Sequence, residues 1–275
     1  MLSYKHWPAS GDPWAHLLLV HGIAEHVGRH RHVAERMAAA GIEVHAYDLR
    51  GFGESEGRRA YIERWSVYHD DLERQLGAVR GRAGALPVVL YGHSLGGLIA
   101  AGYVLTERPR PDVLVLSAPA IAATVPLWKR AAAAVLGNIA PTMEIANEFR
   151  PGTLAHDPAV ETAYRADPLA HHRTTARLGK EVLDEQARVV RALAHVDALP
   201  IPTYVIQGSE DGIVPLGASA LLGEKKNVTR RIYPGGRHEL HNEADGARTI
   251  DDTIAWIRET CGSSSGSQAP HEASR

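Results

Sequence analysis

The segment from Gly92 to Gly96 reads Gly-His-Ser-Leu-Gly and places a serine where it can act as a nucleophile. An apolar run (Pro-Val-Val-Leu-Tyr) precedes the segment, and small and apolar residues follow it over positions 97–103. A serine held on the sharp turn between a strand and a helix forms a nucleophile elbow. The two flanking glycines let neighbouring chain pass close without Cβ clashes. The segment therefore indicates acyl-transfer chemistry, with Ser94 as the nucleophile.

The G-x-S-x-G pattern alone does not single out this serine, because it occurs three times in the chain. Ser264 lies in a Ser/Gly-rich stretch that no strand precedes. Ser55 lies in a charged, glycine-rich loop with no helical apolar pattern after it. Since only Ser94 has both the strand before it and the helix after it, Ser94 is the candidate.

A serine hydroxyl is a weak nucleophile until a base removes its proton. In elbow-containing hydrolases the partners follow in the order serine, acid, histidine, on loops after late strands. An apolar run at 203–207 leads into Gly-Ser-Glu-Asp-Gly, which presents Asp211, and a run at 230–233 leads into a loop that presents His238. We expect His238 to be the general base and Asp211 to orient its ring and stabilise the imidazolium.

Neighbouring residues leave alternatives open for both partners. Glu210 is chemically competent as the acid, and Asp211 precedes a glycine, so it could simply cap a turn. His241 is the rival base, but it lies three residues beyond His238, farther from the strand end. That spacing is one residue short of the zinc-binding H-E-x-x-H pattern, so no metal site is expected. The other histidines are predicted to be surface or packing residues, among them His26, His30, His32, His171 and His172.

The tetrahedral intermediate of acyl transfer needs two backbone N–H groups that point at its oxyanion, each typically worth about 3 kcal/mol. One donor is expected from Leu95, the residue that follows the nucleophile. The second is expected from Ile23, in the His-Gly-Ile loop after the first central strand. Because backbone groups donate, the identity of these two side chains matters little.

Alternating strand and helix patterns predict an α/β fold with a mostly parallel central sheet and helices on both faces. The predicted strands are 16–20, 43–47, 87–91, 113–116, 203–207 and 230–233, with 2–7 as an extra edge strand. The predicted helices are 31–40, 66–82, 95–106, 216–222 and 247–260.

The alternation stops between Ser117 and Ile201, where proline-punctuated helical patterns appear and no strand is expected. We expect residues 1–118 and 201–261 to form the hydrolase core and residues 119–200 to form an inserted helical cap. The stretch 125–136 within this cap is apolar but interrupted by Lys129 and Arg130, which fits a helix packed on the core or a lid that touches lipid. Residues 262–275 are Ser/Gly-rich and are predicted to form a disordered tail.

The composition is that of a globular enzyme, with 44% hydrophobic and 23% charged residues. A net charge of −2 and the absence of basic clusters argue against a nucleic-acid partner. The N-terminus has no signal-peptide pattern and the chain has no apolar run of about eighteen residues. These features predict a cytoplasmic enzyme that can associate peripherally with a membrane. The single cysteine, Cys261, has no internal disulfide partner.

Taken together, these motifs resemble those of the monoglyceride lipases, in the lysophospholipase-like branch of the α/β-hydrolases. The resemblance rests on segments 21–29 (His-Gly-x-x-Glu-His-x-x-Arg), 48–57, 92–97, 116–120, 208–211 and 238–243. The resemblance extends to about Thr260. The chain departs from the family pattern in a shortened N-terminus and in the charged tail.

The resemblance implies an α/β-hydrolase fold and hydrolysis of monoacylglycerols to fatty acid and glycerol through an acyl-enzyme, with no metal or cofactor. It implies the same catalytic residues, namely Ser94, Asp211 and His238, with Ile23 and Leu95 at the oxyanion. A lysophospholipase, a short- or medium-chain carboxylesterase or an aminopeptidase would use the same triad. A non-catalytic binding protein on this scaffold is the alternative of a different class, although every triad position is filled.

Overall fold

The computed structural model describes residues 1–123, 125–147 and 149–264, with no side-chain description for 263 and 264. A seven-stranded sheet with the order β1-β3-β2-β4-β5-β8-β9 forms its centre. All neighbouring strands run parallel except β1, which pairs antiparallel with β3 at one edge. Its strands are β1 (Tyr4–Trp7), β2 (Ala15–Val20), β3 (Ile42–Tyr47), β4 (Val88–His93), β5 (Val113–Ser117), β8 (Ala198–Gly208) and β9 (Lys226–Tyr233).

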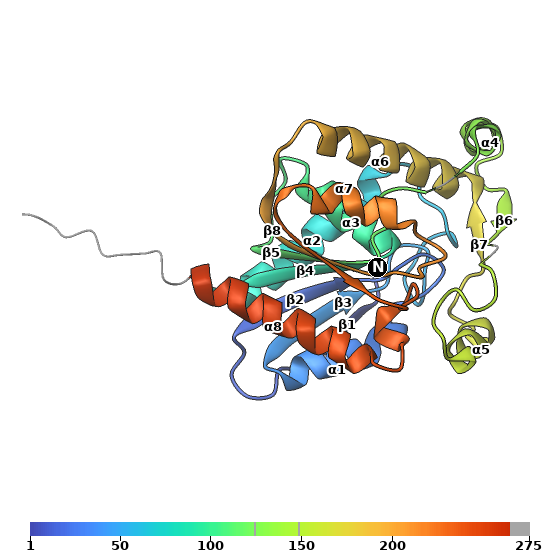
Figure 1. The fold of residues 1–275 in the computed structure, drawn as a ribbon. Helices are drawn as coiled ribbons and strands as arrows, with labels where there is room; N and C mark the ends of the chain where they lie inside the picture. Colours follow the sequence, from blue (N-terminus) through green and yellow to red (C-terminus); the bar gives the residue numbers. More distant parts are fainter. Residues whose placement is uncertain (124, 148, 265–275) are drawn as a thin grey trace, which may run out of the picture.

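Helices cover both faces of this sheet (Figure 1). One face carries α1 (Arg31–Ala39) and α8 (Gly246–Ser264), and the other carries α2 (Ser66–Ala83), α3 (Leu95–Val104) and α7 (Leu216–Gly223). Side chains that alternate along β2 sort into two separate clusters, Leu17 and Leu19 on one face and Leu18 and Val20 on the other. Since a strand buried on both faces is mostly apolar, this burial explains the apolar run over residues 17–20. The predicted α/β-hydrolase fold is confirmed.

Between β5 and β8 the chain leaves the sheet, and residues 118–197 form what we call the insertion. It contains α4 (Leu127–Ile139), β6 (Glu144–Ala146), α5 (Pro158–Ala166), β7 (Arg173–Thr175) and α6 (Ala176–Ala194). In Figure 1, α4, β6, β7 and α5 stand at one end of the sheet, while α6 returns over α3.

The structure corrects three expectations about this region and the C-terminus. A short antiparallel ribbon of β6 and β7 lies where no strand was expected, because strands of three residues are too short to show an alternating pattern. Strand β8 begins at Ala198, before the expected boundary at 201, because Ala198 pairs with Lys226 of β9. Helix α8 continues to Ser264, beyond the expected start of the tail at 262, and residues 265–275 lie outside the described residues.

Two 3-10 turns complete the description, at Val27–His30 after β2 and at Leu240–Asn242 after β9. No helix among the described residues is both long enough and apolar enough to cross a membrane.

Candidate active site

Ser94 lies on the turn between β4 and α3, with φ 52° and ψ −113°, a conformation that L-residues rarely adopt. The Ser94 N–H donates to the Ser117 carbonyl across the β4–β5 ladder at 2.9 Å. A Cβ on Gly96 would lie 2.2 Å from the Val20 carbonyl oxygen, and one on Gly92 would lie 2.5 Å from the Gly96 carbonyl oxygen. The turn therefore needs both glycines because backbone on every side approaches it closely.

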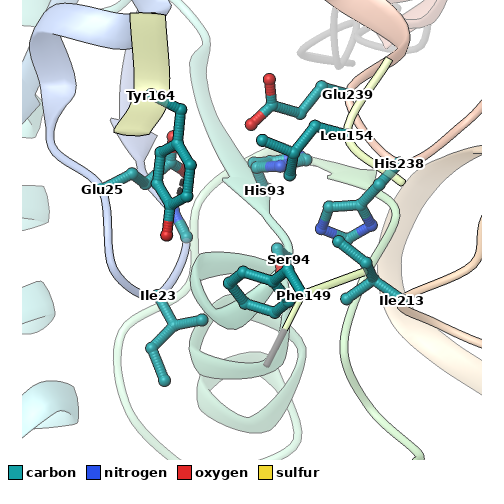
Figure 2. A pocket seen from close by; sticks show the side chains of 11 residues that line it. Ile23, Glu25, His93, Ser94, Phe149, Leu154, Tyr164, Ile213, His238 and Glu239 are labelled. Carbon is teal, nitrogen blue, oxygen red and sulfur yellow. Dashed lines mark hydrogen bonds between the residues drawn. The ribbon is translucent and has the colours of Figure 1, made fainter. Parts of the chain in front are cut away.

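Asp211 and His238 come together from the loops that follow β8 and β9. His238 Nδ1 lies 3.1 Å from Asp211 Oδ1 and 3.0 Å from Oδ2, and both side chains are buried. Figure 2 shows the His238 ring and Ser94 lining the same cavity. The structure thus places a nucleophilic hydroxyl and a carboxylate-bound imidazole at one site, from three loops far apart in the sequence.

The electrostatics of this pair suit a general base. Burial disfavours the charged imidazole, but the Asp211 carboxylate outweighs this effect and raises the pKa of His238 above its usual value. Burial would also raise the pKa of Asp211, but His238 and the N–H groups of Val214 and Ile213 hold it below its usual value. Asp211 is therefore held in its ionised form beside an imidazole that could take up and release a proton.

The rival residues lie elsewhere. The Glu210 side chain is 60% exposed, and His156 Nε2 lies 3.8 Å from its carboxylate. His241 is buried, and its two ring nitrogens make no hydrogen bond to any other described residue. Its ring packs against His30 and His93. Of the four residues considered for the two roles, the geometry brings only Asp211 and His238 together.

The predicted oxyanion donors lie on either side of Ser94. Leu95 is the first residue of α3, and Ile23 lines the cavity together with Gly22 and Ser94. Within the described part of the chain, neither the Ile23 nor the Leu95 N–H donates a hydrogen bond, so both are available to a ligand. A helix N-terminus also favours negative charge, which adds to the donor at Leu95.

A buried network of charged side chains, for which the sequence predicted no role, lies beside the cavity. Glu25 accepts hydrogen bonds from the Gly22 N–H at 2.5 Å and contacts His30 Nε2 at 3.0 Å. Arg29 pairs with Glu239 and lies 3.4 Å from Glu25. Burial raises the pKa of Glu25, but His30, His93 and Arg29 outweigh it and hold that pKa well below its usual value. The His-Gly-x-x-Glu-His-x-x-Arg motif was the signal in the sequence for Glu25 and Arg29.

The insertion supplies the other wall of the cavity. Phe149, Leu154 and Tyr164 face Ser94 and His238 from that side, and Ile213 closes a further edge (Figure 2). The space left has a volume of about 20 Å³ for water-sized spheres, which is room for one or two water molecules.

Comparison with known proteins agrees with this geometry. The serine aminopeptidase S33 family matches residues 11–245 of the chain. A monoacylglycerol lipase of Mycolicibacterium smegmatis is 34% identical over 260 residues, covering 92% of this chain and 91% of the relative. Human monoglyceride lipase is 31% identical over 252 residues, covering 87% and 80%. The crystal structure of Paleococcus ferrophilus monoacylglycerol lipase superposes with a TM-score of 0.82 at 28% identity, covering 94% and 99%.

Proposed function

The chain belongs to the serine aminopeptidase S33 family, and we propose that within it this protein is an ester hydrolase that cleaves monoacylglycerols to fatty acid and glycerol. The observation that carries the proposal is the pairing of His238 with Asp211 in the cavity of Ser94. The similarity to monoacylglycerol lipases over most of the chain supports the choice of substrate.

In the proposed mechanism, His238 removes the Ser94 hydroxyl proton as the serine oxygen attacks the ester carbonyl carbon. The N–H groups of Ile23 and Leu95 stabilise the oxyanion of the tetrahedral intermediate. The C–O bond to glycerol then breaks, and the glycerol oxygen takes the proton from His238. A water molecule, deprotonated by the same histidine, hydrolyses the acyl-enzyme, releases the fatty acid and restores Ser94.

The charges around the cavity favour a neutral ester over a peptide. An aminopeptidase must bind the N-terminal ammonium of its substrate, which needs a carboxylate that no protein cation already neutralises. Glu25 and Glu239 both line the cavity, but both pair with Arg29, and Glu25 also contacts His30. Among the described residues that line the cavity, both carboxylates thus already face Arg29, and neither is left unpaired for a peptide ammonium.

The remaining lining matches a substrate with one apolar and one hydroxylic part. Phe149, Leu154, Ile213 and Ile23 present apolar surface suited to an acyl chain. The buried Tyr164 hydroxyl hydrogen-bonds no other described residue, and it points towards the cavity wall formed by Ile23 (Figure 2). A hydroxyl of the glycerol group would satisfy it.

We assign the insertion (residues 118–197) the role of a cap that admits the substrate and selects it. Helix α4 of this cap exposes apolar side chains, with Leu127 84%, Trp128 69% and Ile139 74% exposed. Because apolar side chains on one exposed helix can enter the surface of a bilayer or micelle, we propose that α4 makes a transient contact with lipid while the substrate enters. This contact would make the enzyme peripherally membrane-associated.

The test is pH-stat titration of the fatty acid released from 1-lauroylglycerol, with dilaurin and the Ser94→Ala variant run in parallel. We expect rapid release from the monoester, little from the diester and none by the variant. Lysophosphatidylcholine, butyrate esters and a prolyl anilide test the alternative substrates of the same triad. Faster cleavage of any of these three would replace the proposed substrate, and failure of a fluorophosphonate to label the protein would refute the enzyme itself.

A further inference from the structure

Gln207, the penultimate residue of β8, lies behind the pair of Asp211 and His238 and takes no part in the proposed bond-making and proton-transfer steps. Its side chain is fully buried. The amide nitrogen lies 3.1 Å from Asp211 Oδ2 and 2.8 Å from the Val214 carbonyl oxygen. Its two N–H groups are thus both used, one on the carboxylate and one on the loop that carries it.

The two oxygens of Asp211 are held in different ways. Oδ1 accepts hydrogen bonds from the backbone N–H groups of Ile213 and Val214, each at 2.9 Å. Oδ2, the oxygen closer to His238, has no backbone donor among the described residues and accepts from the Gln207 amide. Within that part of the chain, Gln207 is the only side chain besides His238 that hydrogen-bonds Asp211.

The direction of the Gln207 amide follows from its surroundings. In the opposite orientation its oxygen would face the Asp211 carboxylate and the Val214 carbonyl, which are both acceptors. In the observed orientation the amide oxygen is buried and has no hydrogen-bond partner among the described residues. An unsatisfied buried carbonyl costs stability, and a hydrophobic side chain of the same size would avoid that cost. This cost has an explanation if the hydrogen bond from the Gln207 amide to Asp211 contributes to the reaction.

We propose that Gln207 is a positioning residue for the hydrolytic reaction, which holds the second carboxylate oxygen of Asp211 so that both oxygens face His238 Nδ1. The amide closes a ring with Asp211 and Val214 and prevents the carboxylate from rotating about its Cβ–Cγ bond. It also withdraws negative charge from the oxygen nearest the imidazole. This role rests on the proposed function, because it needs Asp211 and His238 to take part in the reaction.

Removal of the amide donor should change the pKa of His238 in a predictable direction. The Asp211 carboxylate would keep more of its charge at Oδ2, stabilise the imidazolium more strongly and raise the pKa of His238 further. Among the described residues, the other titratable groups that act on His238 are Glu239 beside it, Glu25 on the loop after β2 and His93 at the end of β4, whose ring centroid lies 5.0 Å away. None of these contacts Gln207, so their influence on His238 is the same in native and variant proteins.

The experiment compares Gln207→Met, which keeps the shape and removes the donors, with Thr203→Val as a matched control. Thr203 is a fully buried polar residue of the same strand, and its hydroxyl bonds the Ile201 carbonyl rather than Asp211. The readouts are kcat/KM for p-nitrophenyl butyrate and the rate of fluorophosphonate labelling, both against pH. For Gln207→Met we expect a fall of about tenfold in kcat/KM, the size expected for loss of one hydrogen bond to a charged group. We also expect the acid limb, the part of the pH profile where activity falls on acidification, to move to higher pH. Thr203→Val should keep the native limb.

A second variant, Gln207→Glu, decides the question if Gln207→Met does not fold. A carboxyl buried beside Asp211 is expected to be protonated near neutral pH, so that it still donates, and to ionise in alkali. The expected result is an additional fall in kcat/KM at alkaline pH that the native enzyme lacks. An acid limb unchanged in Gln207→Met, or the absence of that alkaline fall, would overturn the role of Gln207 alone. A native protein inert to both reagents would refute the proposed function as well.

Discussion

Arg29 Nη2 lies 2.7 Å from Oε1 and 2.8 Å from Oε2 of Glu239, although 210 positions separate the two residues. Arg29 belongs to the 3-10 turn that follows the loop of Ile23, and Glu239 follows His238 directly. The ion pair therefore ties the loop that carries Ile23, the proposed oxyanion donor, to the loop that carries His238, the proposed base.

Replacement of Arg29 by Met should destabilise the fold strongly. The side chains of Arg29, Glu25 and Glu239 are only 9%, 5% and 5% exposed, so two carboxylates would lose their counter-charge inside the protein. Loss of one partner of a buried pair costs about 3–5 kcal/mol, which urea unfolding would measure. Arg36→Met is the control, because Arg36 pairs with Asp251 at the surface and its loss should change the midpoint little. Equal effects of the two variants would contradict the prediction.

Substitutions at Ser94 should abolish activity, and substitution by glycine should in addition relieve the strain in the backbone. Ser94→Ala should lower kcat by several orders of magnitude and abolish fluorophosphonate labelling. Ser94→Gly should be equally inactive but more stable than Ser94→Ala, by about 1 kcal/mol, because glycine adopts the φ of 52° without strain. Thermal unfolding and labelling measure the two effects. Activity retained by Ser94→Ala would show that another residue is the nucleophile.

The activity should depend on pH through His238. The reaction needs the neutral imidazole, and because the pKa of His238 is raised, activity should fall on acidification from a higher pH than for a free histidine, whose pKa is about 6.5. Asp211→Asn removes the main cause of the shift, so it should move the acid limb to lower pH while kcat drops by roughly 10⁴. A kcat/KM profile for each protein provides the measurement. If the acid limb of the Asp211→Asn profile stayed at its native position, a group other than His238 would be responsible for the pH dependence.

The close approach of backbone at the elbow makes Gly96 sensitive and Gly77 tolerant. A Cβ on Gly96 would lie 2.2 Å and 2.6 Å from the carbonyl oxygens of Val20 and His21, which belong to the strand and loop that lead to Ile23. Gly96→Ala should therefore lower the free energy of unfolding by about 3 kcal/mol or more. It should also reduce activity, because it would displace that loop. Gly77 lies within α2 with no atom near its missing Cβ, so Gly77→Ala should stabilise the protein by about 0.5–1 kcal/mol. Chemical unfolding of both variants tests the contrast.

Much of the fold was predictable because its signals are local. Most strands of the sheet contain a short apolar run, and the helices between them carry their own periodicity, so each element can be recognised from its own residues. The Gly-x-Ser-x-Gly turn is equally local, since neighbouring glycines are what its strained backbone requires. Two features were not predicted, namely the three-residue strands β6 and β7 and the first residues of β8. They are strands because of the residues they pair with, and their own residues carry no clear strand pattern.

The parallel α/β architecture, the elbow at Ser94 and the loops on which an acid and a base could lie were therefore predictable from local sequence patterns. Which neighbours come into contact depends on how the chain packs in three dimensions. It brings Asp211 rather than Glu210 to His238, and it leaves His241 packed among other imidazoles. It also joins Arg29 to Glu239 and directs Gln207 at Asp211. These contacts depend on strand register and on the packing of distant loops, to within about an ångström, and no short window of sequence contains that information.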